Sequence, residues 1–154
     1  MKKRMKELQA PLAGEMSGHI FIADGYLGFD DAIYAAVRVI TQMVETGQSI
    51  TAFMESLPVQ HATPELRIDC PDTRKFSTMD RIQGHVLTHH DETDVNVIDG
   101  VRVRSKAGWW LIRASNTEAA LVARAEAASA DGLAGLIDEL EGTLKAAGLD
   151  WRQP

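Results

Sequence analysis

A short polar loop after an apolar run carries the side chains that a phosphate site needs. Arg113, Ser115, Asn116 and Thr117 stand within five positions, directly after the apolar run 109–112. An arginine guanidinium can bind two phosphate oxygens as a planar fork, and hydroxyl and amide groups add neutral donors. A tight turn can also direct backbone N–H groups toward the same anion. The spacing equally suits a surface turn with a solvated arginine, and composition alone favours that alternative.

Two stretches of the sequence resemble the α-D-phosphohexomutases, the phosphomannomutase/phosphoglucomutase family. The stretch Arg113-Ala114-Ser115-Asn116-Thr117-Glu118 resembles the phosphate-binding loop of that family's last domain. Upstream, Gly14-Glu15-Met16-Ser17-Gly18-His19 is similar to its sugar-binding loop. Gly28-Phe29-Asp30-Asp31 and Asp99-Gly100-Val101-Arg102-Val103 also resemble family stretches, and all four occur in the family's order. The resemblance therefore covers nearly the whole chain.

The resemblance implies roles for seven side chains. In the last domain, the phosphate that does not react is held by Arg113, Ser115, Asn116 and Thr117. In the upstream loop, Glu15 and Ser17 bind ring hydroxyls, because a carboxylate accepts hydrogen bonds from two vicinal hydroxyls at once. Without the motif, Glu15 would be assigned to a helix cap or an ion pair. His19 either touches the substrate, assists proton transfer near neutral pH, or fixes the loop.

The sequence lacks the parts of the family that perform the chemistry. No stretch resembles the phosphoserine motif Ser-His-Asn-Pro, and no Asp-x-Asp-x-Asp magnesium loop occurs. We therefore expect no catalytic residue, no metal ligand and no cofactor in this chain. The resemblance implies magnesium and a hexose bisphosphate activator for the full-length family enzyme. The acidic cluster Asp91-Glu92-Thr93-Asp94 has the wrong spacing, and we expect a solvated loop there.

The first sixty residues predict a truncated α/β domain. Residues 1–9 have a helical pattern, and Ile20-Phe21-Ile22 predicts a short strand. Asp30 is predicted as the N-cap of a helix that ends at Gly47, and Ser49 as the cap of a second, short helix. Helical spacing of apolar side chains supports the first helix at Ile33, Ala36, Val37, Ile40 and Val44. A linker at 59–63 divides the chain into domains 1–60 and 61–154.

The second domain is predicted to be α+β, with helices on one face of an antiparallel sheet. Strands are expected at 65–69, 95–98, 101–104, 109–114 and 121–126. Asp99-Gly100 predicts a two-residue hairpin turn between the second and third of these strands. Helices are expected at 75–85, with Phe76, Met79, Ile82 and Val86 on one face, and from Asp131 to Gly148. The family resemblance implies a TATA-box-binding-protein-like fold for this domain.

Size and charge limit the classes of function. The 154 residues are 45% hydrophobic, enough for a packed core, and the formal charge is −6 from 16 basic and 22 acidic residues. This balance excludes a general binder of nucleic acid or of anionic membranes. A single cysteine, Cys70, permits no intrachain disulfide. No apolar run approaches the roughly 18 residues of a membrane span, so we expect a cytoplasmic location.

These observations predict a C-terminal fragment of a phosphomannomutase/phosphoglucomutase-like enzyme. Its ligand would be a hexose phosphate, such as mannose or glucose 1- or 6-phosphate, and the fragment alone would be inactive. The alternative is a stand-alone, non-catalytic sugar-phosphate-binding or oligomerisation module. Because the apolar helix at 30–46 lacks most of its usual partner sheet, we expect either a dimer or a disordered N-terminal third. The sequence does not show whether the ligand is a mannose phosphate or a glucose phosphate.

Overall fold

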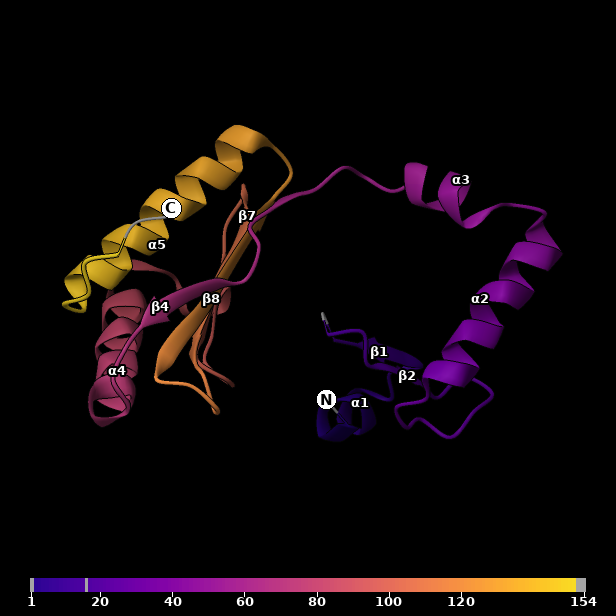
Figure 1. Cartoon of the computed structure of the whole chain (residues 1–154), viewed down its shortest axis with the longest axis horizontal. Coiled ribbons are helices and arrows are strands. Elements are labelled where there is room, and N and C mark those ends of the chain that lie inside the picture. The colour runs from indigo at the N-terminus through magenta and orange to yellow at the C-terminus, as the bar shows by residue number, and fades with distance from the viewer. Residues whose placement is uncertain (1, 16, 152–154) are drawn as a thin grey trace. The chain divides into compact units, whose positions relative to one another are not determined.

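The computed structural model describes residues 2–15 and 17–151. The chain divides into two compact units, Met1–Leu57 and Pro58–Pro154 (Figure 1). The first unit contains helix α1 (Lys2–Leu8), the strands β1 (Leu12–Gly14) and β2 (Ile20–Ile22), and the helices α2 (Ala32–Thr46) and α3 (Ile50–Glu55). None of the described helices is long and apolar enough to cross a lipid bilayer.

The strands of the first unit form an antiparallel pair, with Leu12 opposite Ile22. The sequence analysis predicted β2 but not β1. Three residues without period-two alternation give little signal of a strand.

The predicted cap of α2 was wrong by one position, since Asp31 Oδ1 accepts a hydrogen bond from Tyr34 N at 2.8 Å. This hydrogen bond lowers the pKa of Asp31, and a second from the Tyr26 hydroxyl adds to the effect. Asp30 instead pairs with Phe21 in an isolated bridge.

The ends of α2 and α3 follow their sequence signals. Gly47 ends α2 in a left-handed conformation with φ of 65°, as predicted. Ser49 Oγ accepts from Ala52 N at 3.1 Å and begins α3, also as predicted. One side of α2 lines a groove of about 500 Å³ together with β1, β2 and α3. The side chains of Ile33 and Val44, by contrast, are 80% and 78% exposed.

The second unit is a six-stranded antiparallel sheet covered on one side by two helices (Figure 1). Its strands are β3 (His61–Ala62), β4 (Leu66–Asp69), β5 (Val95–Asn96), β6 (Val101–Arg104), β7 (Gly108–Ala114) and β8 (Ala120–Ala127). The order is β3-β8-β7-β6-β5, and β4 also pairs with β8. Helices α4 (Asp72–His89) and α5 (Ala130–Ala146) pack on this sheet and on each other, and η1 (Glu92–Asp94) is a 3-10 turn. The predicted α+β class is confirmed.

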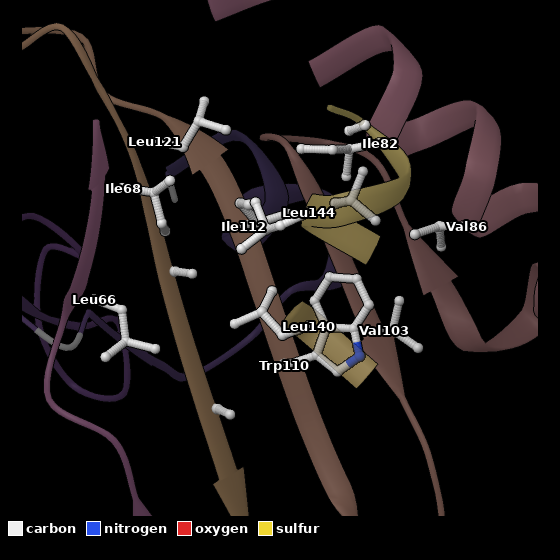
Figure 2. Close-up of a cluster of buried hydrophobic side chains, with 14 of the residues drawn as sticks. Leu66, Ile68, Ile82, Val86, Val103, Trp110, Ile112, Leu121, Leu140 and Leu144 are labelled. Carbon is white, nitrogen blue, oxygen red and sulfur yellow. The ribbon is translucent and has the colours of Figure 1, made fainter. Parts of the chain in front are cut away.

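The core of this unit lies between the helices and the sheet (Figure 2). Trp110 and Ile112 of β7 are fully buried, as are Ile82 of α4 and Leu140 and Leu144 of α5. Burial of each such aliphatic side chain contributes roughly 1.5–3 kcal/mol of transfer free energy. Trp110 Nε1 donates to Glu139 Oε1 at 2.7 Å, so the indole N–H is not left unpaired in the core.

The structure corrects the predicted helix face and linker. Helix α4 begins at Asp72, three residues before the predicted start. Its Phe76 side chain is 68% exposed and not on the buried face, whereas Lys75 is 5% exposed. The predicted buried face did not include Lys75, because the charge of a lysine is costly to desolvate. Part of the predicted linker forms β3, which pairs with the end of β8. The last helix is capped by Ser129, whose Oγ accepts from Gly132 N at 3.1 Å.

The predicted two-residue hairpin turn was also wrong. Strand β5 ends at Asn96, so four residues separate it from β6, and the Asn96 side chain accepts from Ile98 N at 3.0 Å. Gly100 has φ of 75°, and a Cβ there would lie within 2.7 Å of Arg113 Cα and against the Ile112 carbonyl. Two separate features therefore require a glycine at this position: the left-handed backbone conformation and the close approach of β7.

We expect Gly100→Ala to destabilise the second unit by about 3 kcal/mol, because the left-handed conformation is strained and β7 must move. The matched variant Gly148→Ala meets only open space at φ of 82° and should cost about 1 kcal/mol. Chemical denaturation followed by tryptophan fluorescence measures both. Equal losses in the two variants would show that contact with β7 is not the constraint at Gly100.

Candidate functional site

The loop between β7 and β8 is closed by a turn that Ser115 organises. Ser115 N donates to Ala120 O at 2.9 Å and continues the pairing of the two strands. Its Oγ accepts from Thr117 N at 3.3 Å and from Glu118 N at 3.1 Å. A serine hydroxyl at the start of a turn satisfies backbone donors in this way. The hydroxyl still has its own proton, so Ser115 can both shape the loop and donate to an anion.

Arg113 extends from the face of the sheet opposite the helices. Neighbouring side chains of a strand point to opposite faces, and Ile112 is buried in the core. Arg113 lies opposite Val122 of β8 and is partly exposed. Within the described part of the chain, no carboxylate forms an ion pair with its guanidinium. The fork of donors is thus available to an external anion.

The remaining members of the loop face solvent or a neighbouring strand. Asn116 and Thr117 are exposed. Glu118 forms an ion pair with Arg67 of β4, which also pairs with Glu65 at 2.9 Å. Glu118 and then Glu65 raise the pKa of Arg67 above its usual value. The carboxylate of Glu118 is therefore directed toward β4. All four residues predicted for the phosphate loop thus lie at the end of β7 or in the loop that follows it.

Lys75 is a member of this site that the sequence analysis missed. Its Nζ donates to Ser115 O at 2.7 Å and to Glu118 O at 2.9 Å, so α4 holds both ends of the turn. One signal could have revealed it. Lys75 stands four residues before Met79 and seven before Ile82, on the apolar face of the helix. A lysine in such a position needs partners within the core.

The upstream loop between β1 and β2 is a separate polar turn in the first unit. Glu15 N donates to His19 O at 2.9 Å, and Gly18 N donates to Glu15 O at 2.9 Å. Gly18 has φ of 88°, a conformation that favours glycine. Ser17 Oγ lies 3.4 Å from Glu15 Oε2, so the two predicted ligands of ring hydroxyls are neighbours. Met16 lies outside the described residues.

His19 has a structural partner in this turn. Its Nδ1 lies 2.6 Å from Asp30 Oδ2, and Asp30 Oδ1 accepts from Ile20 N at 3.2 Å. A carboxylate on one ring nitrogen fixes the orientation of the imidazole and leaves Nε2 free for another contact. This geometry supports the loop-fixing role, one of the alternatives that the sequence left open for His19.

The acidic stretch at 91–94 is a structural turn. Glu92–Asp94 forms η1, and Asp94 lies 3.4 Å from Arg104 of β6. His90 Nε2 lies 3.2 Å from Glu139, which also accepts from Trp110. Across residues 2–15 and 17–151, no group of three or more histidine, cysteine, aspartate or glutamate side chains is placed to hold a metal ion.

Two family models match adjoining parts of the chain. The one described as phosphoglucomutase/phosphomannomutase, C-terminal domain, matches residues 65–142. The one described as phosphoglucomutase/phosphomannomutase, alpha/beta/alpha domain III, matches residues 1–61. The chain therefore belongs to the phosphoglucomutase/phosphomannomutase family, the α-D-phosphohexomutases, and corresponds to its third-domain and C-terminal-domain regions.

Individual relatives agree with this assignment. A phosphomannomutase/phosphoglucomutase of Pseudomonas putida is 46% identical over 129 residues, which is 84% of this chain and 27% of the relative. The enzyme of that name from Pseudomonas aeruginosa is 37% identical over 95% of this chain and 31% of its own length. A phosphoglucomutase of Neisseria gonorrhoeae is 35% identical over 82% of this chain and 27% of its length.

A solved structure shows the same fold. A phosphoglucomutase/phosphomannomutase family protein from Burkholderia thailandensis superposes with a TM-score of 0.79 at 35% identity. The match covers 96% of this chain and 30% of that protein. The chain thus spans roughly a quarter to a third of the length of the relatives it matches.

Proposed function

We propose that this chain is the part of a phosphohexomutase that holds a hexose phosphate by its non-reacting phosphate and by its ring hydroxyls. Arg113 binds two phosphate oxygens as a fork, and the side chains of Ser115, Asn116 and Thr117 donate to the others. The observation that carries the proposal is the loop between β7 and β8. There, Ser115, Asn116 and Thr117 closely follow an arginine that has no ion pair with a carboxylate among the described residues, and the Ser115 hydroxyl closes the turn.

The upstream loop supplies a second half-site. The carboxylate of Glu15 accepts from vicinal ring hydroxyls, and Ser17 adds a hydroxyl that is able to donate or accept. His19, whose Nδ1 is held by Asp30, has Nε2 available for a contact with the ligand. These contacts recognise the middle of the sugar ring, whereas the Arg113 loop recognises a phosphate at its end. Such a division suits a substrate whose two phosphorylated ends exchange places between half-reactions.

The phosphoryl transfer between C1 and C6 belongs to the full-length family enzyme. Neither the phosphoserine motif nor the magnesium loop is present in these 154 residues. Magnesium would support phosphoryl transfer by neutralising charge on the transferring group, and the hexose bisphosphate would maintain the phosphorylated serine. This chain would contribute positioning of the substrate, which lowers the barrier by fixing the reacting end.

An amide-shift NMR titration tests the binding proposal. With glucose 1-phosphate, we expect the amides of Ser115, Asn116 and Thr117 to shift with a dissociation constant of about 1 mM, roughly −4 kcal/mol. Inorganic phosphate should shift the same amides. Shifts at Ser17 and His19 that occur with glucose 1-phosphate but not with inorganic phosphate would show that the upstream loop binds the sugar. No shift in either loop at millimolar ligand would refute the proposal.

The contribution of the guanidinium can be isolated within the same experiment. Arg113→Gln should weaken phosphate binding at least tenfold, because a bidentate, charge-assisted contact is lost. Arg104→Gln removes the same charge from the neighbouring strand β6, where Arg104 pairs with Asp94. This control should bind within about twofold of the native chain, since an exposed charge is screened by salt.

We expect the chain alone to have no mutase activity. Glucose 1-phosphate or mannose 1-phosphate, incubated with magnesium and the hexose bisphosphate activator, should be converted no faster than in a buffer blank. The physical reason is that binding groups without a nucleophile position the substrate but cannot accept its phosphoryl group. Turnover above the blank, retained after purification by a second method, would show that another residue of this chain serves as nucleophile.

A second candidate function, self-association through the first unit, has its own observation. Ile33, Val37, Ile40 and Val44 form an exposed apolar stripe along α2. Their spacing of four, three and four residues is that of a helix-pairing seam. Exposed apolar surfaces of this kind mark interaction sites on soluble proteins. We propose that two copies of the chain associate through this stripe.

Sedimentation velocity measures this association directly. The native chain should sediment as a dimer, and Ile40→Glu should sediment as a monomer, because a carboxylate at the seam is desolvated on pairing. Gln42→Glu adds the same charge to α2 on the side that lines the groove, away from the stripe, and should leave the dimer intact. A native chain that stays monomeric at the concentrations used for NMR would contradict this proposal and leave phosphate binding untouched.

A further inference from the structure

Lys75 is a buried cation directly beneath the candidate phosphate loop. Its side chain is 6% exposed, although a lysine is almost never buried without partners. Nζ donates to Ser115 O at 2.7 Å, to Glu118 O at 2.9 Å and to Asp72 Oδ1 at 2.7 Å. An ammonium group has three donors, so the three acceptors satisfy it completely. Two of the three belong to the loop.

Two other carbonyls near the end of the loop are also bonded within the protein. Ala119 O accepts from Cys70 N at 3.0 Å, and Ala120 O accepts from Ser115 N at 2.9 Å. Together with the two carbonyls held by Lys75, four of the six from residue 115 to residue 120 are bonded within the protein. A carbonyl oxygen carries partial negative charge and repels a phosphate at close range. These four carbonyls are therefore already bonded and do not offer a free oxygen to an anion at the loop.

We propose that Lys75 is a positioning residue of the phosphate site, which holds the Ser115 and Glu118 carbonyls away from the anion. This inference rests on the proposed function, because it assigns a role within the same site. Cys70 and Ser115 use neutral N–H groups for the neighbouring carbonyls. At Ser115 O and Glu118 O, one side chain from α4 reaches two acceptors at once and still has a third donor for Asp72 Oδ1, which no neutral side chain supplies from one nitrogen.

The carboxylate of Asp72 completes the arrangement. Its side chain is 71% exposed, so it offsets the charge of Lys75 from the solvent side and leaves the ammonium group in place beneath the loop. Without the ammonium group, the two loop carbonyls and this carboxylate would lose a charge-assisted partner. The carbonyls would then turn toward water, on the side where the phosphate is expected to bind.

The test compares Lys75→Met with Lys145→Met by the phosphate titration described above. Both variants remove one positive charge from the second unit, but Lys145 is exposed on α5. We expect Lys75→Met to weaken binding of inorganic phosphate by about tenfold or more and to shift the Thr117 and Glu118 amides before any ligand is added. Lys145→Met should do neither. Lys75→Arg, which keeps charge and donors, should recover part of the affinity.

A measurement on the native chain covers the case in which Lys75→Met does not fold. A lysine ammonium held by three acceptors exchanges its protons slowly enough for a ¹H–¹⁵N signal. We expect this signal of Lys75 to shift with phosphate in parallel with the Thr117 amide. A Lys75 signal unchanged by phosphate would overturn the positioning role, as would a folded Lys75→Met variant with native affinity.

The two proposals fail in distinguishable ways. If the native chain shows no shift in the Ser115–Thr117 amides with phosphate, the proposed function fails and Lys75 has no phosphate site to position. If the native chain binds phosphate and Lys75→Met binds it equally well, only the role of Lys75 is lost. In that second case, the buried lysine contributes to folding stability only. Denaturation of Lys75→Met would then show a lower free energy of unfolding, while its phosphate affinity would equal that of the native chain.

Discussion

The pairing of β7 with β8 is the constraint on which both the core and the candidate site of the second unit depend. Seven residue pairs fix their register, from Gly108 opposite Ala127 to Ala114 opposite Leu121. Because side chains alternate, this register directs Trp110 and Ile112 into the core and Arg113 to the open face. A slip of one residue would exchange the two sets and expose the indole. The free energy of core burial therefore also fixes the face of the sheet from which Arg113 extends.

For the binding of a phosphate, the groups at the loop itself matter more than the net charge of the protein. With a formal charge of −6, the chain as a whole repels a sugar phosphate, and the effect is weakened by salt. At the loop, Arg67 and Lys75 have carboxylate partners, so their net contribution to the field is small. What remains is the guanidinium of Arg113 and the side-chain donors of Ser115, Asn116 and Thr117. Oriented donors do not have to reorganise when an anion arrives, which is why they bind it effectively.

Sequence signals identified the helices and most strands because their caps and periodicity are local. Helix α2 ends at Gly47 and α3 begins after Ser49, both as predicted, and the apolar run 109–112 lies in β7. The residues of each candidate loop were found because each loop is contiguous in sequence. Lys75 was missed because its partners stand forty and forty-three residues away, and no local pattern encodes that contact. Likewise, β3 is too short for a period and exists only through pairing with β8.

The proposed function also explains why these loops do not reveal which hexose is bound. In a reaction that returns the sugar in the opposite orientation, the same loop must grip a phosphate carried by either C1 or C6. Arg113 and its neutral neighbours can do so only by recognising the phosphate itself, since the sugar atoms beside it differ in the two orientations. The binding free energy of this remote group can then be used to fix the reacting end. A loop that recognises only phosphate gains nothing from flexibility, because its ligand has the same shape each time. Rigid support of the kind that Ser115 and Lys75 provide is what such a task requires.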